Sequence, residues 1–153
     1  MSLRDEEIPA PAGTPGRDGT GATVEIDPRR VGRVHCGYAP DPDGEPDPGE
    51  IVWTWVPYEE NDGRGKDRPV LVVAREEADT LLAVQLTSRR RENNHEWIPL
   101  GAGPWDSQGR ESWVDIDRVL RIHAHGMRRE ACALDRARFQ LVVHRLQQHH
   151  GWR

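Results

Sequence analysis

The sequence predicts a small, mainly β fold of the α+β class, in which a barrel or sandwich of short strands precedes one C-terminal helix. Short runs rich in β-branched and aromatic residues follow one another between residues 51 and 122, with polar turns between them. Apolar residues spaced by three and four positions follow near the end of the chain, which is typical of an amphipathic helix. Strand-rich order with short turns favours a small barrel or sandwich.

The most informative stretch holds two strand-like runs, residues 51–56 and 70–74, on either side of a polar loop at residues 59–67. The loop contains two glycines and delivers Arg68 directly before Pro69. A proline disfavours helix at the preceding residue and fixes the entry into the second run. Arg68 is therefore expected at a strand end beside a loop.

A third strand-like run, residues 81–86, ends in Thr87 and Ser88, and three arginines follow. We expect Arg68 and Thr87 to lie at neighbouring strand ends. Further strands are expected at residues 96–100, 112–114 and 119–122, and a short strand or packed arm within residues 23–38.

The C-terminal helix has recognisable signals at both ends. Asp135 is a candidate N-cap, and Gly151 is a natural stop. The residues expected on its buried face are Phe139, Val142, Val143 and Leu146.

Composition divides the chain into three parts. Residues 1–22 are rich in proline and glycine and are expected to be a disordered tail. Residues 23–46 are expected to be an arm and a Pro/Asp-rich linker, and residues 47–153 the folded barrel domain.

Residues 1–48 hold five arginines against ten acidic residues, whereas residues 49–153 hold sixteen basic and sixteen acidic residues. A neutral domain needs a local basic cluster to bind nucleic acid.

Cysteine usage and hydropathy predict a cytoplasmic protein without membrane association. Cys36 and Cys132 are far apart and lack a CxxC motif, which favours reduced thiols over a disulfide. No apolar run approaches transmembrane length, and the acidic amino terminus lacks the hydrophobic segment of a signal peptide.

Five segments, in this order, resemble the MazF/PemK toxins of bacterial type II toxin–antitoxin modules. They are GEIVW, KDRPVLVV, VQLTS, then ESWVDIDRVLRI at residues 111–122 and the helix at residues 134–151. Order and spacing carry the resemblance, because RP and LTS are common. It implies an SH3-like barrel with the helix packed against it, usually as a homodimer whose two sites lie along the shared interface.

The resemblance also implies an activity. Toxins of this family cleave single-stranded RNA without a metal or other cofactor: the 2′-hydroxyl is the nucleophile, and a 2′,3′-cyclic phosphate and a 5′-hydroxyl end remain. A cognate antitoxin protein holds them inactive by laying an acidic or amphipathic tail along the RNA groove. Arg68 and Thr87 match the family's functional arginine and threonine.

The chemistry of these two residues suits that reaction. A guanidinium binds phosphate oxygens with a bidentate fork and is a poor proton shuttle, so Arg68 is expected to stabilise charge. Thr87 is expected to donate its hydroxyl to the same phosphate. The alternative for Arg68 is an ion pair with Asp67 or Glu60. For Thr87, the alternative is a hydroxyl that only caps a turn.

The general base departs from the family pattern. Many members carry a glutamate five residues before this arginine, where this chain has Gly63. The candidate bases are therefore the carboxylates of the same loop, Glu60, Asp62 and Asp67. The residues expected to bind RNA are Lys66, Ser88, Arg89, Arg90 and Arg91, although a solvated loop is the alternative for the arginines.

Other interpretations stay open. The missing glutamate and the neutral domain agree with a non-catalytic SH3-like module that binds RNA or a peptide. An exposed Trp105 can stack on bases, whereas Trp53 and Trp55 are expected in the core. A zinc site can be drawn from the histidines of residues 123–150, but no cysteine or carboxylate stands at ligand spacing, so no metal is predicted. The acidic N-terminal arm can fold over the arginines and reduce RNA access.

Overall fold

The computed structural model describes residues 22–31, 36–40, 47–58, 64–76, 80–89, 97–123 and 128–152. Within these ranges the elements are β1 (Val24–Ile26), β2 (Glu50–Pro57), β3 (Gly65–Arg75), β4 (Thr80–Thr87), β5 (Trp97–Gly101), β6 (Ser112–His123), β7 (Arg128–Ala133) and α1 (Arg136–His150). The fold is α+β and mainly β, as predicted. Residues 1–21 of the expected disordered tail lie outside the described residues.

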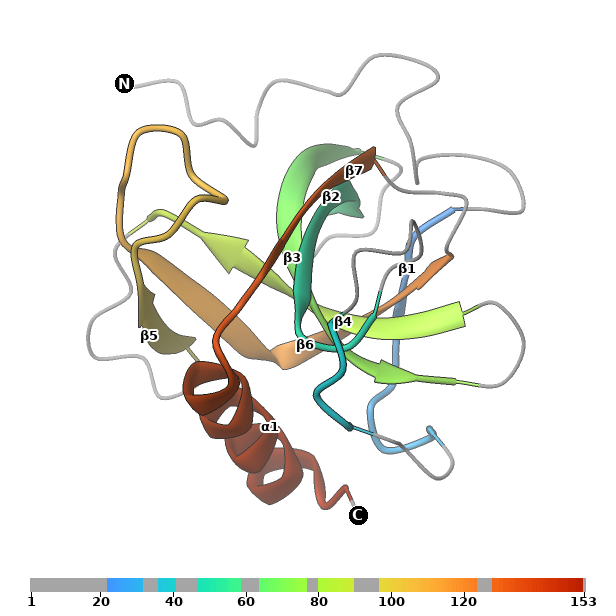
Figure 1. The fold of residues 1–153 in the computed structure, drawn as a ribbon. Coiled ribbons are helices and arrows are strands. Elements are labelled where there is room, and N and C mark those ends of the chain that lie inside the picture. Colours follow the sequence, from blue (N-terminus) through green and yellow to red (C-terminus); the bar gives the residue numbers. More distant parts are fainter. Residues whose placement is uncertain are drawn as a thin grey trace.

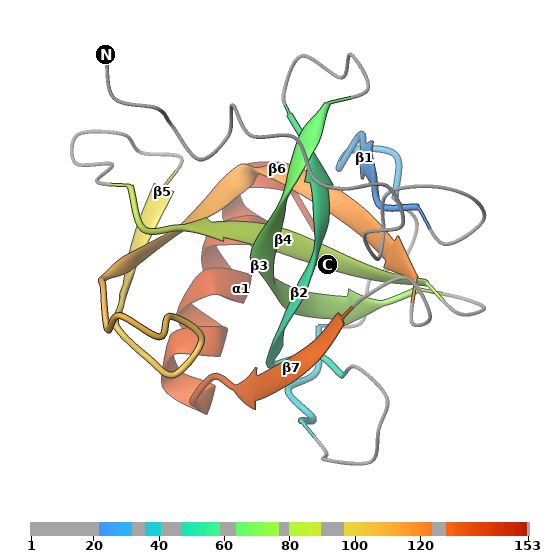
Figure 2. The same ribbon diagram turned by 90° about the horizontal axis from the view of Figure 1, so that it is seen from above.

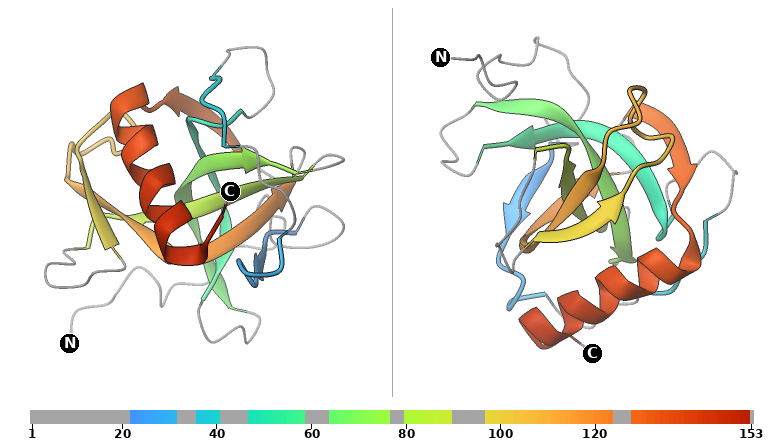
Figure 3. Two further views of the ribbon diagram at one scale, coloured as in Figure 1. Left: turned by 90° about the horizontal axis from the view of Figure 1, so that it is seen from below. Right: turned by 90° about the vertical axis from the view of Figure 1, so that its left-hand side faces the viewer.

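The described strands form one curled antiparallel sheet in the order β1-β6-β4-β3-β2-β7, and β5 pairs with β6 off this path. The long strand β6 pairs with β5 through its first residues and with β1 through its last. Helix α1 lies across one face of the curled sheet (Figures 1 and 3). The view from above shows the strands crossing in front of the helix (Figure 2).

Successive side chains of a strand point to opposite faces of the sheet, and apolar side chains are buried on both faces here. One cluster lies between the sheet and α1 and includes Leu71, Val84, Val114 and Leu134. The other lies on the opposite face and includes Val52, Val70, Val72, Ala83 and Leu120.

Helix α1 has the ends and the buried face that the sequence predicts. The side chain of Asp135 accepts a hydrogen bond from the backbone N–H of Arg138 at 3.0 Å. Gly151 ends the helix in the left-handed region, with φ of 71°. The buried residues are Phe139, Val142, Val143 and Leu146. In the described part of the chain, no helix is long and apolar enough to cross a membrane.

Strand β3 begins earlier than the sequence predicts. The sequence places residues 65–67 in the polar loop, but they pair with β2, so Arg68 lies inside the strand and opposite Thr54. Pro69 is tolerated because this part of β3 pairs with β2 alone, and pairing with β4 begins at Val70. Arg68 is therefore held by a strand rather than by a loop.

Strand β6 is continuous, although the sequence predicts two separate runs. The interrupting residue Arg118 is only 5% exposed. Its Nε donates to Glu25 Oε1 at 2.8 Å and its Nη2 donates to the carbonyl oxygen of Pro57 at 2.5 Å. Partners on β1 and β2 thus satisfy the buried guanidinium, which allows the strand to continue.

The described part of the N-terminal arm packs on the domain, one of the two roles expected for it. Strand β1 pairs with β6, and Thr23 Oγ1 lies 3.0 Å from Thr54 Oγ1 of β2. Just after β1, the carbonyl oxygen of Pro28 accepts a hydrogen bond from the indole Nε1 of Trp152 at 2.8 Å. The arm therefore joins the sheet to the end of α1.

Both cysteines are free thiols, as predicted. Burial raises the pKa of Cys36 to about 11 and also raises the pKa of Cys132. Neither group is therefore a reactive thiolate near neutral pH.

An ion pair joins the end of β3 to β6 and makes stability depend on pH. Glu76 accepts hydrogen bonds from Arg121 Nε at 2.7 Å and Nη2 at 2.8 Å, which lower the pKa of this carboxyl from its usual 4.5. Because the folded-state pKa is depressed, the stabilisation is present above the unfolded pKa and is lost as the pH falls through the folded one.

We expect Glu76→Gln to lower the free energy of unfolding at pH 7 by about 1 kcal/mol. Below pH 4.5 the difference from the wild type should shrink, and it should vanish below the depressed folded-state pKa, where the carboxyl is protonated in both states. Urea unfolding at pH 7 and pH 3 measures both values. Glu111→Gln, at an exposed position, is the matched control. An equal destabilisation at both pH values would contradict the ion-pair explanation.

Candidate active site

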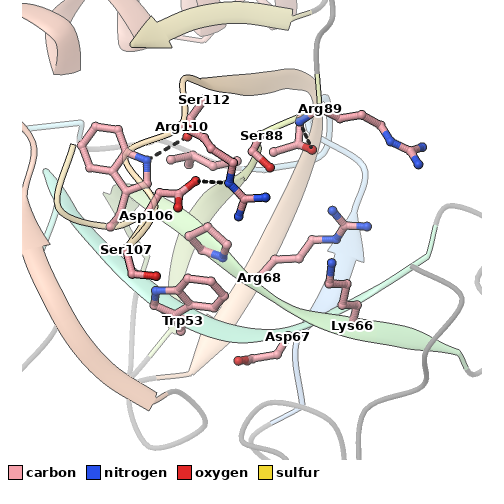
Figure 4. Close-up of a pocket in the computed structure, with 14 residues that line it drawn as sticks. Trp53, Lys66, Asp67, Arg68, Ser88, Arg89, Asp106, Ser107, Arg110 and Ser112 are labelled. Carbon is pink, nitrogen blue, oxygen red and sulfur yellow. Dashed lines mark hydrogen bonds and ion pairs between the residues drawn. The ribbon is translucent and has the colours of Figure 1, made fainter. Parts of the chain in front are cut away.

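A cavity of about 470 Å³ lies beside the ends of β3 and β4, and the loop between β5 and β6 forms its opposite wall (Figure 4). Cavities of about 300–1,000 Å³ hold small-molecule ligands, so this one has room for a nucleotide. The strand side is lined by Trp53, Lys66, Asp67, Arg68, Pro69, Leu86, Thr87, Ser88 and Arg89. The loop side is lined by Trp105, Asp106, Ser107, Arg110 and Ser112.

Antiparallel pairing explains why Arg68 and Thr87 meet. Val70 of β3 pairs with Gln85 of β4. Arg68 lies two positions before Val70 and Thr87 two positions after Gln85, so the antiparallel register places them opposite each other. Side chains two positions apart point to the same face of a strand, and both of these residues line the cavity. The structure thus brings together the two residues that the sequence places at neighbouring strand ends.

The Thr87 hydroxyl is fixed by a local contact. Its Oγ1 accepts a hydrogen bond from the backbone N–H of Arg89 at 3.1 Å. This is the turn-capping role that the sequence offers as the alternative for Thr87. A hydroxyl that accepts a hydrogen bond still has its own proton to donate, so the cap orients the group without preventing a contact with a ligand.

Asp67 and Arg68 are consecutive strand residues, so their side chains leave the strand on opposite faces. Figure 4 shows the Asp67 carboxylate beside Trp53 and directed away from the Arg68 guanidinium. This arrangement does not favour the ion pair between Arg68 and Asp67 that the sequence leaves open. Asp67 nevertheless lines the same cavity.

Three of the expected RNA-binding residues, Lys66, Ser88 and Arg89, also line the cavity. The other expected site residues, Glu60, Asp62, Arg90 and Arg91, lie outside the described residues. No residue from the described part of the acidic arm lines the cavity.

The tryptophans near the cavity do not have the positions that the sequence suggests. Trp105 is only 4% exposed, and its Nε1 donates to Ser112 Oγ at 2.9 Å. Trp53, expected in the core, is half-buried and lines the cavity. Trp55 is in the core, as predicted. The aromatic surface offered to a ligand is therefore the indole of Trp53.

Sequence reasoning missed the loop wall of the cavity. Asp106, Ser107 and Arg110 come from a segment far from Arg68 in the chain, and only the fold places them opposite β3. Arg110 Nε donates to Asp106 Oδ2 at 2.9 Å. The available signal was the Gly/Pro-rich composition of GAGPWDSQG, which marks a loop but does not assign it a neighbour.

The cavity is locally basic, although the whole chain has a formal net charge of −5. Its described lining contains two acidic residues, Asp67 and Asp106, and four basic residues, Lys66, Arg68, Arg89 and Arg110. Clustered basic side chains in a concave site attract anions more strongly than the global charge suggests. This cluster fits a polyanionic ligand.

The histidines at the end of α1 have structural partners. His149 Nε2 lies 3.1 Å from Asp117 Oδ1, and His150 Nε2 lies 2.6 Å from the carbonyl oxygen of Ile116. Burial lowers the pKa of His150. Among the residues that the structure describes, no group of three His, Cys, Asp or Glu side chains is placed to share a metal ion.

The fold and the cavity define a class of protein: a small, mainly β domain with one C-terminal helix and a basic cavity at its strand ends. Residues 47–150 match the PemK-like, MazF-like toxins of type II toxin–antitoxin systems, and the chain belongs to this family. Membership places it among the endoribonuclease toxins.

A solved structure of an endoribonuclease from a mycobacterial species has a similar fold, with a TM-score of 0.50. The two sequences are 19% identical, and the likeness covers 70% of this chain and 92% of the other. At this level of identity the comparison supports the fold alone. A search of curated proteins found no match.

Proposed function

We propose that the protein cleaves single-stranded RNA in the cavity between β3, β4 and the β5–β6 loop, by attack of a 2′-hydroxyl on the neighbouring phosphate. The observation that carries this proposal is the placement of Arg68 and Thr87 on adjacent strands, in one basic cavity with room for a nucleotide. Membership of the toxin family supports the same reaction.

In the proposed reaction, a base removes the proton of the 2′-hydroxyl while its oxygen forms a bond to phosphorus. The bond from phosphorus to the 5′-oxygen then breaks, and this oxygen receives a proton. The products are a 2′,3′-cyclic phosphate and a 5′-hydroxyl end. Arg68 stabilises the extra charge on the phosphorane with its N–H fork, and Thr87 donates its hydroxyl to the same phosphate. This route requires neither a metal nor another cofactor.

The general base is proposed to be one of the carboxylates Glu60, Asp62 and Asp67. Asp67 lines the cavity but is directed away from Arg68 (Figure 4), so as the base it would act from the side of Trp53. The residues proposed to contact the RNA backbone are Lys66, Ser88, Arg89, Arg90 and Arg91. The half-buried indole of Trp53 is proposed to stack on a base, a contact worth about 1–3 kcal/mol.

A toxin of this family has a protein antitoxin as partner and RNA as substrate. We propose that the antitoxin presents an acidic or amphipathic segment to the basic cavity and competes with RNA there.

A homodimer in the cytoplasm is proposed from the family likeness. Light scattering of the purified protein tests the dimer, and a monomeric mass at micromolar concentration would exclude it. Cell fractionation tests the location, and a membrane or extracellular fraction would exclude it.

The purified protein is expected to cleave mixed-sequence single-stranded RNA in excess EDTA and to leave cyclic-phosphate ends. Thr87→Ala should lower kcat/KM about 100-fold, because one donor to the phosphorane is lost, whereas Thr87→Ser keeps the hydroxyl and most of the rate. Mass spectrometry of the fragments identifies the ends, and gel assays give the rates.

The same assay separates the candidate bases. Replacing the true base by its amide in Glu60→Gln, Asp62→Asn or Asp67→Asn should remove the acid limb of the pH–rate profile. RNA that is bound but not cleaved by the wild type would overturn the catalytic proposal and favour a non-catalytic binding module.

A further inference from the structure

We infer that Arg110 is a second phosphate-binding residue of this cavity, acting on the opposite wall from Arg68. The inference rests on the proposed RNA-binding function and concerns a residue that no part of the family resemblance assigns. It follows from three features: a rigidly anchored loop, the orientation of one guanidinium and the size of the space between the two walls.

The loop that carries Arg110 is anchored to the core at Trp105. The indole is buried, and a Cβ on Gly103 would approach its ring carbon Cζ3 to 2.0 Å, so the loop closes tightly over the ring. The guanidinium of Arg138 on α1 lies 5.5 Å from the ring centroid, and its Nη1 donates to the carbonyl oxygen of Leu100 at 2.7 Å. The loop wall is therefore tied to both the helix and β5.

Hydrogen bonds within the loop then fix Arg110. The carboxylate of Asp106 accepts from the backbone N–H of Gln108 and from Arg110 Nε, both at 2.9 Å. The backbone N–H of Gly109 donates to the Asp106 carbonyl oxygen at 3.0 Å, and the φ of 68° at this position favours glycine. These hydrogen bonds fix the position of the Arg110 side chain relative to the cavity.

The orientation of Arg110 suits a phosphate. Asp106 contacts Nε, whereas the two terminal amino groups form the end-on fork that binds phosphate oxygens. Figure 4 shows this guanidinium pointing toward the middle of the cavity, across from Lys66 and Arg68. Half of the Arg110 side chain remains exposed, at 52%, so ligand access is open.

The ion pair with Asp106 does not prevent this role. Asp106, whose side chain is only 9% exposed, contacts Arg110 through Nε. A further hydrogen bond from a terminal amino group of Arg110 to a charged phosphate contributes about 1.5–3 kcal/mol. Asp106 mainly reduces the rotational freedom of the arginine before the ligand binds. A nucleotide has a phosphate on each side, and a cavity of about 470 Å³ between two guanidiniums allows each phosphate to meet one of them.

The test is the salt dependence of binding to a single-stranded oligonucleotide whose 2′-hydroxyls are all methylated, which the proposed reaction cannot cleave. Loss of one phosphate contact lowers the slope of log Kd against log salt concentration by about 0.7 for a single strand. Arg110→Gln should show this decrease, with binding about tenfold weaker at low salt. Arg110→Lys should keep the slope, because the charge remains. Arg30→Gln, at an 87% exposed arginine outside the cavity, is the matched control and should change neither quantity.

The outcomes for Arg110 and for the proposed function can be told apart. Unchanged affinity and slope in Arg110→Gln, with RNA cleavage intact in the wild type, would overturn the role of Arg110 alone. The expected decrease in slope, with no RNA cleavage by the wild type, would support the phosphate contact and overturn the proposed reaction. Thermal melting of each variant verifies that the fold is retained.

Discussion

Arg68→Ala is expected to lower kcat/KM for RNA cleavage by about a thousandfold or more and to leave the melting temperature nearly unchanged. A guanidinium that stabilises the charge of a phosphoryl transition state contributes about 10³–10⁵ to the rate. Arg68 is half-buried at the rim of the sheet, and the core residues beside it, Val70 and Leu71, remain in place. Cleavage rates and thermal melting of the same preparation measure the two effects.

Two further variants sharpen this experiment. Arg68→Lys keeps the charge but not the bidentate fork, so we expect a rate between those of the wild type and Arg68→Ala. Arg30→Ala removes an exposed arginine away from the cavity and should cleave at the wild-type rate. Undiminished cleavage by Arg68→Ala would remove this residue from the mechanism. A large fall in its melting temperature would instead assign Arg68 a structural role.

Trp105→Ala is expected to lower the free energy of unfolding by about 3–5 kcal/mol, a large part of the roughly 5–15 kcal/mol that stabilises a small domain. The substitution leaves a cavity under the loop and removes the partner of the Ser112 hydroxyl. It also removes the ring that lies against Gly103 and under Arg138, so the wall that carries Arg110 should lose its position. Urea unfolding measures the stability.

Trp53→Ala is the comparison that distinguishes a core tryptophan from a ligand-binding one. Its half-buried indole lines the cavity, so we expect weaker RNA binding by about 1–3 kcal/mol and a smaller loss of stability than in Trp105→Ala. The reverse result, with RNA binding weakened and stability retained in Trp105→Ala, would make Trp105 the stacking residue and contradict its burial in the structure.

Much of the site could be predicted because its two central residues lie on strands that follow each other in the sequence and pair in the sheet. Arg68 and Thr87 lie on consecutive strands, and an antiparallel pair with a short connection brings their ends together. The helix was equally readable, since Asp135, Gly151 and the apolar spacing between them are local signals. The extent of β3 could not be predicted, because the polar residues 65–67 belong to the strand only through their pairing with β2.

The sequence by itself determined the elements whose signals are local: the order of β2 to β6, the caps of α1 and the placement of Arg68 and Thr87 near the ends of consecutive strands. Only the tertiary structure decided what depends on distant neighbours. It made β7 a strand by pairing its RREACA segment with β2, left Trp53 half-buried in the cavity wall while burying Trp105, and placed Arg110 across the cavity from Arg68. The reason is physical. Backbone propensity and side-chain period act over a few residues, whereas burial and the walls of a cavity depend on which distant segments pack together.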